Sequence, residues 1–420
     1  MNKWGRITRS FLISGLGMLC VVLGGCGKKA EDPVTVTIIH AWGGTGTDHM
    51  AMREIYEDFQ KQNPDIELQM LSMPAREEML RKVEDMIMVG NMPDIVTFSG
   101  MGQNSTYDFI VKNDMALDLM PYIKEDPEFA SNISNANMNH WTTSEDSLYT
   151  IADVLSLSGG YWYNRDILKA AGVEELPKTW EEFYDMCDQV QNWSANELCD
   201  IKPHQTSPEG FLYFMDHMLL QDIDINSENY KNKIGTRELQ TALENLKKIY
   251  NYSGDENAQY SYLDETKLFN EGQLAIYVNG VWGAPMISES IDAGYALIPT
   301  DSGKSMSCES ACLGYVLANS GNTQKEEASI RFLKYMLSEE VQTRILEETE
   351  QIPANAQVSW ENYKEEKPRL YQAASLVLQA EQKTEVPDNL WSAAQKATFT
   401  DTIFDVLTGS VSVEELSGNL

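Results

Sequence analysis

An alternation of strand-like and helix-like segments near the start of the chain restricts its fold more than any other feature. Residues 34–40 (VTVTIIH) are β-branched and apolar, which is typical of a buried strand, and a glycine-rich stretch follows them. A helix is expected next, capped by Asp48, and then a second strand over 66–71. The residues that set the helical spacing are Met52, Ile55, Tyr56 and Phe59. Strand, helix, strand is the unit of a parallel sheet, so the sequence predicts an α/β fold.

The same alternation continues along the chain. A helix is expected over 77–89 and a strand over 94–98, with Gly and Pro residues between them. The later predicted strands lie at 159–163, 274–278, 295–298 and 315–318. The C-terminal part is mainly helical, and no repeat of 20 to 50 residues is visible, which argues against a solenoid.

The first 25 residues have the pattern of an export signal. Three basic residues precede the uncharged stretch 11–23, and small residues lead to Cys26. The ending Leu-Gly-Gly-Cys resembles a bacterial lipobox, which predicts a lipoprotein signal peptide over 1–25, lipidation of Cys26 and a polar tether over 26–33. An ordinary secretory signal is the alternative. Two acyl chains on one cysteine would anchor the protein stably to a membrane.

The charge balance limits the kinds of partner. The 420 residues include 32 Lys and Arg against 64 Asp and Glu, which gives a formal net charge of -32. Binding to nucleic acid or to an anionic membrane surface rests on clustered basic residues, so we expect neither. The 42% of hydrophobic residues is enough for a large core, and the length suggests two or three globular units.

No motif points to a metal, a cofactor or catalysis. Cys187 and Cys199 could close a disulfide loop or could be free thiols, and Cys308 with Cys312 lacks the spacing of a zinc site. The glycines after the first strand do not complete a dinucleotide fingerprint, and no nucleophile elbow or zinc-protease motif occurs. We therefore expect no cofactor, no metal and no catalytic residues.

Aromatic residues gather near the ends of predicted strands. Flat aromatic faces with polar edges suit sugar rings, although most single aromatic residues in a chain of this size belong to the core. The residues concerned are Trp42, Phe98, Tyr161, Trp162, Tyr163, Trp282 and Tyr315.

Several segments in order resemble the family 1 extracellular solute-binding proteins of ABC importers, whose members include maltose-binding-like proteins. The segments are TIIHAWGG, FQKQNPDIEL, VGNMPDIVTFSG, DMALDLMPYI, the stretch from SLYTIADV through YWYNRD to PKTWEEF, and LFNEGQLAIYVNGVWG with GYALIP. FLKYMLSEEVQ, QIPANAQV and VLTGSVSVEEL complete the series. Two positions depart from the family pattern: Ala152 stands where proline is usual, and Ile276 where methionine is usual.

The resemblance implies a two-lobed fold of the periplasmic-binding-protein type (type II), with three crossing segments and a ligand cleft between the lobes. The crossings are expected near 151–153, 299–301 and 350–354. Lobe one would comprise 34–150 plus 300–350, and lobe two 154–298 plus 354–420. Open α/β sheets bind ligands at the carboxyl ends of their strands, which agrees with a site between the lobes.

The implied function is capture of a carbohydrate, an oligosaccharide in particular, for an ABC importer, without enzymatic activity. The expected partners are the permease subunits and, through the lipid, the extracytoplasmic face of the cell membrane, and the protein is expected to be a monomer. The expected ligand contacts are Trp42, Thr45, Asp48, Phe98, Ser99, Asp153, Tyr161, Tyr163 and Trp282. Strand alternation sends Tyr161 and Tyr163 to one side and Trp162 to the other, and we favour the first pair. A polyol, a phosphodiester or an exported glycan-degrading activity are the alternatives.

Overall fold

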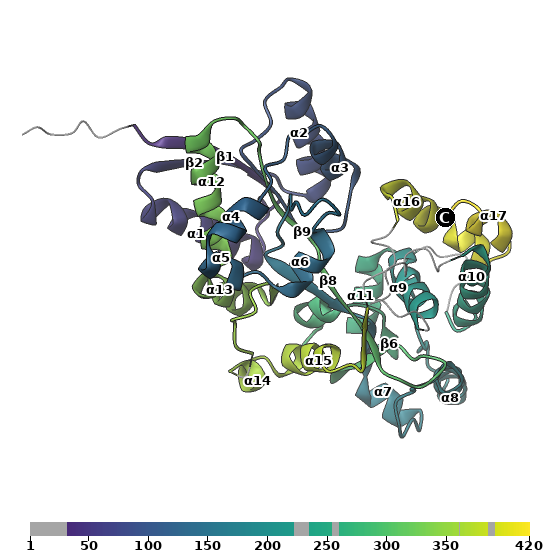
Figure 1. Ribbon diagram of the computed structural model, residues 1–420. Coiled ribbons are helices and arrows are strands. Elements are labelled where there is room, and N and C mark those ends of the chain that lie inside the picture. The colour runs from purple at the N-terminus through teal and green to yellow at the C-terminus, as the bar shows by residue number, and fades with distance from the viewer. Residues whose placement is uncertain (1–31, 222–234, 254–259, 361, 385–390) are drawn as a thin grey trace, which may run out of the picture.

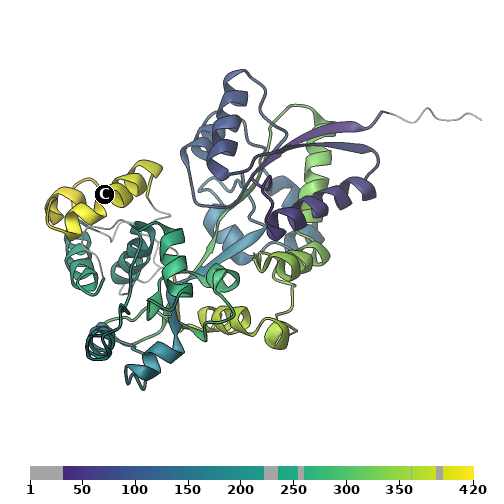
Figure 2. The same ribbon diagram turned by 180° about the vertical axis from the view of Figure 1, so that it is seen from behind.

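The computed structural model describes residues 32–221, 235–253, 260–360, 362–384 and 391–420. Cys26 and the leader before it lie outside these ranges. Figures 1 and 2 show two lobes, with the β1 strand in the first and the C-terminal helices in the second. In the described part of the chain, no helix combines the length and the apolar character needed to cross a membrane.

Lobe one is built on a four-stranded sheet with the order β2-β1-β3-β9. Strands β1 (Val34–His40), β2 (Ile66–Ser72) and β3 (Ile95–Met101) are parallel, and β9 (Leu313–Leu317) runs antiparallel to β3. The helices of this lobe include α1 (Thr47–Gln62), α2 (Arg76–Met88), α3 (Ser105–Lys112), α12 (Thr323–Met336) and α13 (Glu339–Thr349). The expected parallel unit at the start of the chain is therefore confirmed.

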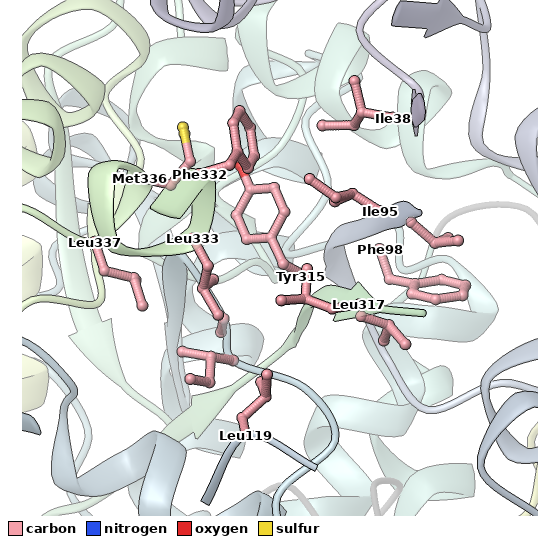
Figure 3. Close-up of a cluster of buried hydrophobic side chains, with 14 of the residues drawn as sticks. Ile38, Ile95, Phe98, Leu119, Tyr315, Leu317, Phe332, Leu333, Met336 and Leu337 are labelled. Atoms are coloured by element: carbon pink, nitrogen blue, oxygen red, sulfur yellow. The ribbon is translucent and has the colours of Figure 1, made fainter. Parts of the chain in front are cut away.

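The core of lobe one forms where β3 and β9 meet α12. Tyr315 on β9 is fully buried, and its ring lies 5.7 Å from that of Phe332 on α12. Figure 3 shows these two rings among aliphatic side chains from both ends of the chain, including Ile38, Ile95 and Leu333. Residues separated by some 300 positions thus share one core, because β9 inserts beside β3.

Lobe two has a smaller antiparallel sheet with the order β6-β5-β7. Its strands are β5 (Gly160–Asn164), β6 (Ile276–Tyr277) and β7 (Ala293–Leu297). The surrounding helices include α8 (Trp180–Glu197), α9 (Pro208–Leu220), α10 (Thr236–Tyr250), α11 (Tyr262–Asn270), α15 (Pro368–Leu378), α16 (Ala393–Leu407) and α17 (Val413–Ser417). The short 3-10 helix η2 (Val281–Met286) follows β6. The aromatic residues Phe183, Phe211 and Phe214 anchor a separate hydrophobic core in this lobe.

A third sheet lies between the lobes, with the order β10-β4-β8-β11. Its strands are β4 (Val154–Ser158), β8 (Met306–Ala311), β10 (Ile352–Pro353) and β11 (Gln382–Thr384). Figure 1 shows β8 running from one lobe to the other. This middle sheet was not expected from the sequence.

The expected crossover near 299–301 passes through the middle sheet before it reaches lobe one. Thr300 forms a turn in which its hydroxyl donates to the carbonyl of Lys304 at 2.9 Å. The chain then continues through β8, which pairs with β4, and enters the lobe one sheet after Cys312. This route was not expected, because β8 pairs with strands from distant parts of the chain, which no local sequence pattern reveals.

The first crossover is held by Asn137, on helix α6 (Asn135–Trp141). The backbone N–H of Ala152 donates to Asn137 Oδ1 at 2.8 Å, and Asn137 Nδ2 donates to the carbonyl of Ala152 at 3.0 Å. Proline has no N–H and could not make the first bond. Alanine at this position therefore has a structural role of its own, because its backbone N–H and carbonyl both form hydrogen bonds with the buried Asn137 side chain.

Candidate ligand-binding site

A pocket of about 260 Å³ lies in lobe one where the carboxyl ends of β1, β2 and β3 come together. The rule for open α/β sheets places ligand sites at this edge. Its polar and aromatic lining residues are Trp42, Asp48, His49, Arg76, Thr97, Ser99 and Gln351. Three of the residues expected from the sequence, Trp42, Asp48 and Ser99, thus line one pocket.

A second and larger hollow, about 520 Å³, lies at the opposite end of the same sheet. It is lined by Asp118, Tyr122 and Glu125, and it lies beside the start of β3, where Ala318 N donates to the carbonyl of Asp94. We take the smaller pocket as the site, because it lies at the carboxyl edge of the sheet and close to the crossovers.

The backbone around Trp42 is held by a buried imidazole. The N–H of Trp42 donates to Nδ1 of His40 at 3.1 Å, so the ring proton of His40 is on Nε2, which faces Ser72 Oγ at 3.1 Å. Burial lowers the pKa of His40 to about 4, and the ring is neutral at physiological pH. Arg53 donates to the carbonyls of Trp42 and Gly44, and it tightens the same turn.

Strand alternation decides which residues of β3 reach the pocket. Thr97, Ser99 and Met101 line it, whereas Phe98 points to the other face of the sheet. Phe98 lies among buried hydrophobic side chains in Figure 3. Its ring centre lies 6.4 Å from that of Tyr107. This placement corrects the expectation for Phe98, which belongs to the core of lobe one.

Asp153 lies behind the pocket wall and not on its surface. It is fully buried and accepts hydrogen bonds from Ser99 Oγ at 2.7 Å and from the Tyr315 hydroxyl at 3.0 Å. Burial raises the pKa of the Asp153 carboxyl. Its backbone carbonyl accepts from the N–H of Ala354 in the third crossover at 3.1 Å. Asp153 therefore orients Ser99 and connects the pocket wall to two crossovers.

In lobe two, Trp282 is half-buried on η2 and makes an edge contact with Tyr213 of α9, with ring centres 6.1 Å apart. Gly280 is required here, since a Cβ at that position would lie 2.1 Å from the Trp282 ring. Glu265 on α11 connects the strand end before η2 to the start of α9. Its carboxyl accepts from the N–H of Ser207 at 3.1 Å and from that of Val278 at 3.3 Å.

The aromatic residues of β5 take the opposite arrangement to the one favoured from the sequence. Tyr161 is fully buried and packs 5.9 Å from Phe183 of α8. Trp162 points the other way and donates its indole N–H to the carbonyl of Gly280 at 3.0 Å. Tyr163 is half-buried, with the guanidinium of Arg165 5.6 Å from its ring centre. Trp162 is thus the residue of β5 that contacts the turn before Trp282, and its hydrogen bond to Gly280 helps to position that turn.

Two remaining expectations concern the loop after β1. Thr45 is exposed and does not line the pocket. Asp48 lies within the first turn of α1, and the cap position is taken by Gly46, so Asp48 does not cap this helix. Its carboxylate is consequently available to the pocket.

No disulfide joins Cys187 to Cys199 or Cys308 to Cys312 in the described residues. Within the described ranges, no group of three or more His, Cys, Asp or Glu residues could hold a metal ion.

Arg76, His49 and Gln351 were missed by sequence reasoning. Arg76 follows β2 directly, and the convergence of strand carboxyl ends could have nominated it. Gln351 comes from the third crossover, and its buried side-chain oxygen has no hydrogen-bond partner in the described structure. Only the tertiary fold brings this acceptor to the pocket.

A family model for bacterial extracellular solute-binding proteins matches residues 54–370. The chain belongs to this family. Its members bind solutes outside the cytoplasm, so the chain is an extracytoplasmic binding protein and not an enzyme. The two-lobed α/β fold expected from the sequence is confirmed.

Individual relatives agree with the family. The chain is 22% identical over 356 residues to a multiple sugar-binding protein of Streptococcus mutans, covering 80% of this chain and 79% of the relative. A Streptococcus pneumoniae solute-binding protein, solved in complex with the blood group A-trisaccharide, has a TM-score of 0.76 at 19% identity, covering 91% and 97% of the two chains. A family 1 extracellular solute-binding protein from Bifidobacterium longum has a TM-score of 0.67 at 17% identity, covering 93% and 98%. At these identities the two structures establish the fold.

Proposed function

We propose that the protein captures an oligosaccharide between its lobes and delivers it to an ABC importer. The observation that carries the proposal is the pocket at the carboxyl edge of the lobe one sheet, where an aromatic residue, Trp42, lies among hydrogen-bonding side chains. That combination suits a ring with apolar faces and a rim of hydroxyls. The sugar-binding relative and the trisaccharide complex of the structural neighbour support the same ligand class.

Closure of the lobes would complete the site. A ligand stabilises a closed state only through contacts that the open state lacks, so both lobes must contribute. In lobe one the contacts would come from Trp42, Asp48 and Ser99. In lobe two they would come from Trp282, with Tyr213 at its edge. The short crossovers next to Asp153 and Ala354 would serve as the hinge.

The proposal extends to the setting of the protein. Lipidation of Cys26 after removal of 1–25 would hold it on the outer face of the membrane, with 26–33 as a tether to the permease. It would act as a monomer. The proposed lobes keep their expected limits, 34–150 plus 300–350 and 154–298 plus 354–420, with the middle sheet as the region shared between them.

Isothermal calorimetry of the domain from residue 32 onward against mono- and oligosaccharides tests this function. Trp282→Ala and Trp42→Ala should each weaken binding by at least about 1 kcal/mol, because each removes an aromatic face. Trp193→Ala, on α8 and outside both walls, is the matched control and should leave the affinity unchanged. No measurable heat of binding with any saccharide, together with measurable binding of peptides, would refute the proposal.

A further inference from the structure

Arg76 gives the pocket a cation that the sequence did not reveal. It is the first residue of α2, its side chain is exposed, and it lines the pocket. One guanidinium nitrogen lies 2.8 Å from the position that a Cβ on Gly100 would occupy, and Gly100 has φ +71°. The absence of a Cβ at Gly100 therefore leaves the space beside β3 that the Arg76 guanidinium occupies.

Arg76 has no acidic partner among the described residues. By contrast, Arg165, Arg331 and Arg344 pair with carboxylates at 2.6 to 2.9 Å. Arg53 and Arg369 donate to backbone carbonyls. Arg76 is thus a guanidinium with free donors at the edge of the candidate site.

Arg76 is the one Lys or Arg among the residues that line the pocket, and Asp48 is the one carboxylate. His49 accepts from the N–H of Gly44 through Nδ1 at 2.9 Å. Helices α1 and α2 both begin here without a side-chain cap, so their N-termini add positive potential, and the exposed Glu77 and Glu78 in the first turn of α2 oppose it. A ligand carboxylate therefore has one specific cationic partner in this pocket, the Arg76 guanidinium, in a chain that has twice as many acidic as basic residues.

From this arrangement we infer that the ligand is an acidic saccharide, a hexuronate oligosaccharide whose carboxylate is bound by Arg76. The inference rests on the proposed function and narrows its ligand class. A guanidinium can donate two parallel hydrogen bonds to a carboxylate, which a neutral hydroxymethyl group cannot accept. Asp48 and the Gln351 amide would accept from ring hydroxyls beside it.

The test compares galacturonate and glucuronate oligosaccharides with their carboxyl-reduced, neutral counterparts by calorimetry. The wild-type protein should bind at least one hexuronate about tenfold or more tightly than its reduced form. Arg76→Gln should remove that preference, whereas Arg76→Lys should keep part of it. Arg81→Gln is the control, because Arg81 is exposed on the same helix but does not line the pocket. Raising NaCl from about 50 to about 500 mM should weaken hexuronate binding alone.

The outcomes separate the two proposals. Neutral sugars that bind as tightly as hexuronates, with no effect of Arg76→Gln, would overturn this inference and leave the sugar-binding function standing. Binding of sulfated sugars without hexuronates would overturn the choice of a carboxylate. Failure of every saccharide, charged or neutral, would overturn both. Thermal melts of each variant check that a loss of binding is not a loss of folding.

Discussion

Each lobe places a buried carboxyl group behind its aromatic wall, but the two carboxyls have different partners. In lobe one, Asp153 accepts from the hydroxyls of Ser99 and Tyr315, and its own backbone bonds to the third crossover. In lobe two, Glu265 accepts from the backbone N–H groups of Ser207 and Val278. The first carboxyl connects the wall to the hinge; the second connects two loops of the same lobe.

This difference indicates how the two walls are built. The lobe one wall consists of strand ends, whose position the sheet already determines, and Asp153 adds their connection to the crossovers. The lobe two wall consists of the start of α9 and the turn before η2, which lie after the isolated bridge between Lys202 and Leu274. A carboxyl that accepts from both segments extends their connection beyond that bridge. We therefore expect changes at Asp153 to act on the hinge and changes at Glu265 to act locally.

The largest effect is expected for Asp153→Ala, which removes the buried acceptor of the Ser99 and Tyr315 hydroxyls and leaves Tyr315 with the Tyr56 hydroxyl, 3.1 Å away, as its partner. Unfolding free energy should fall by about 3 kcal/mol, measured by urea denaturation. Asp292→Ala is the control: Asp292 is exposed and pairs with the partly exposed Arg165, so little change is expected.

The double variant Ser99→Ala/Asp153→Ala measures how much of this stability loss comes from the hydrogen bond between the two side chains. Because the two side chains share a hydrogen bond, the double variant should lose less stability than the sum of the single losses. Strict additivity would show that Asp153 does not connect the pocket wall to the crossover.

A smaller, pH-dependent effect is expected at Glu265. Burial raises the pKa of its carboxyl from 4.5 to about 8, so the folded protein keeps a proton that the unfolded chain loses. The stabilisation is complete below about pH 4.5 and is lost as the pH rises toward 8. Between pH 4.5 and pH 6 alone, the expected loss is on the order of 2 kcal/mol. Thermal melts across this range should show a falling melting temperature, and Glu265→Gln should flatten the profile.

Glu271→Gln supplies the comparison for this experiment, because Glu271 ends the same helix but is exposed. Its profile should follow that of the wild type. An identical pH profile for Glu265→Gln and the wild type would mean that Glu265 does not carry the proton, and the contrast between the two carboxyls would then fail.

Sequence reasoning worked where local pattern and tertiary structure agree. The apolar run 34–40 became β1 with the same bounds, since a β-branched segment buried on both faces needs no distant information. The middle sheet was missed for the opposite reason. Strand β8 (MSCESA) has little apolar character, and it is a strand because it pairs with β4 and β11, which lie about 150 and 75 positions away.

The candidate site divides in the same way. Trp42, Asp48 and Ser99 were found because they lie at or just after the carboxyl ends of strands that the sequence predicts clearly. Phe98 and Tyr161 were assigned to the site because a strand pattern fixes alternation but not which face is the inner one. Gln351 depends on a crossover whose position is set by the whole fold.

Small-angle X-ray scattering of the protein, alone and with a saturating saccharide identified by calorimetry, tests the central claim most directly. If the ligand joins Trp42 in lobe one to Trp282 in lobe two, the radius of gyration should decrease on binding, and Trp282→Ala should reduce the change at equal ligand concentration. A radius of gyration that stays the same at full saturation would contradict closure of the two lobes around a sugar.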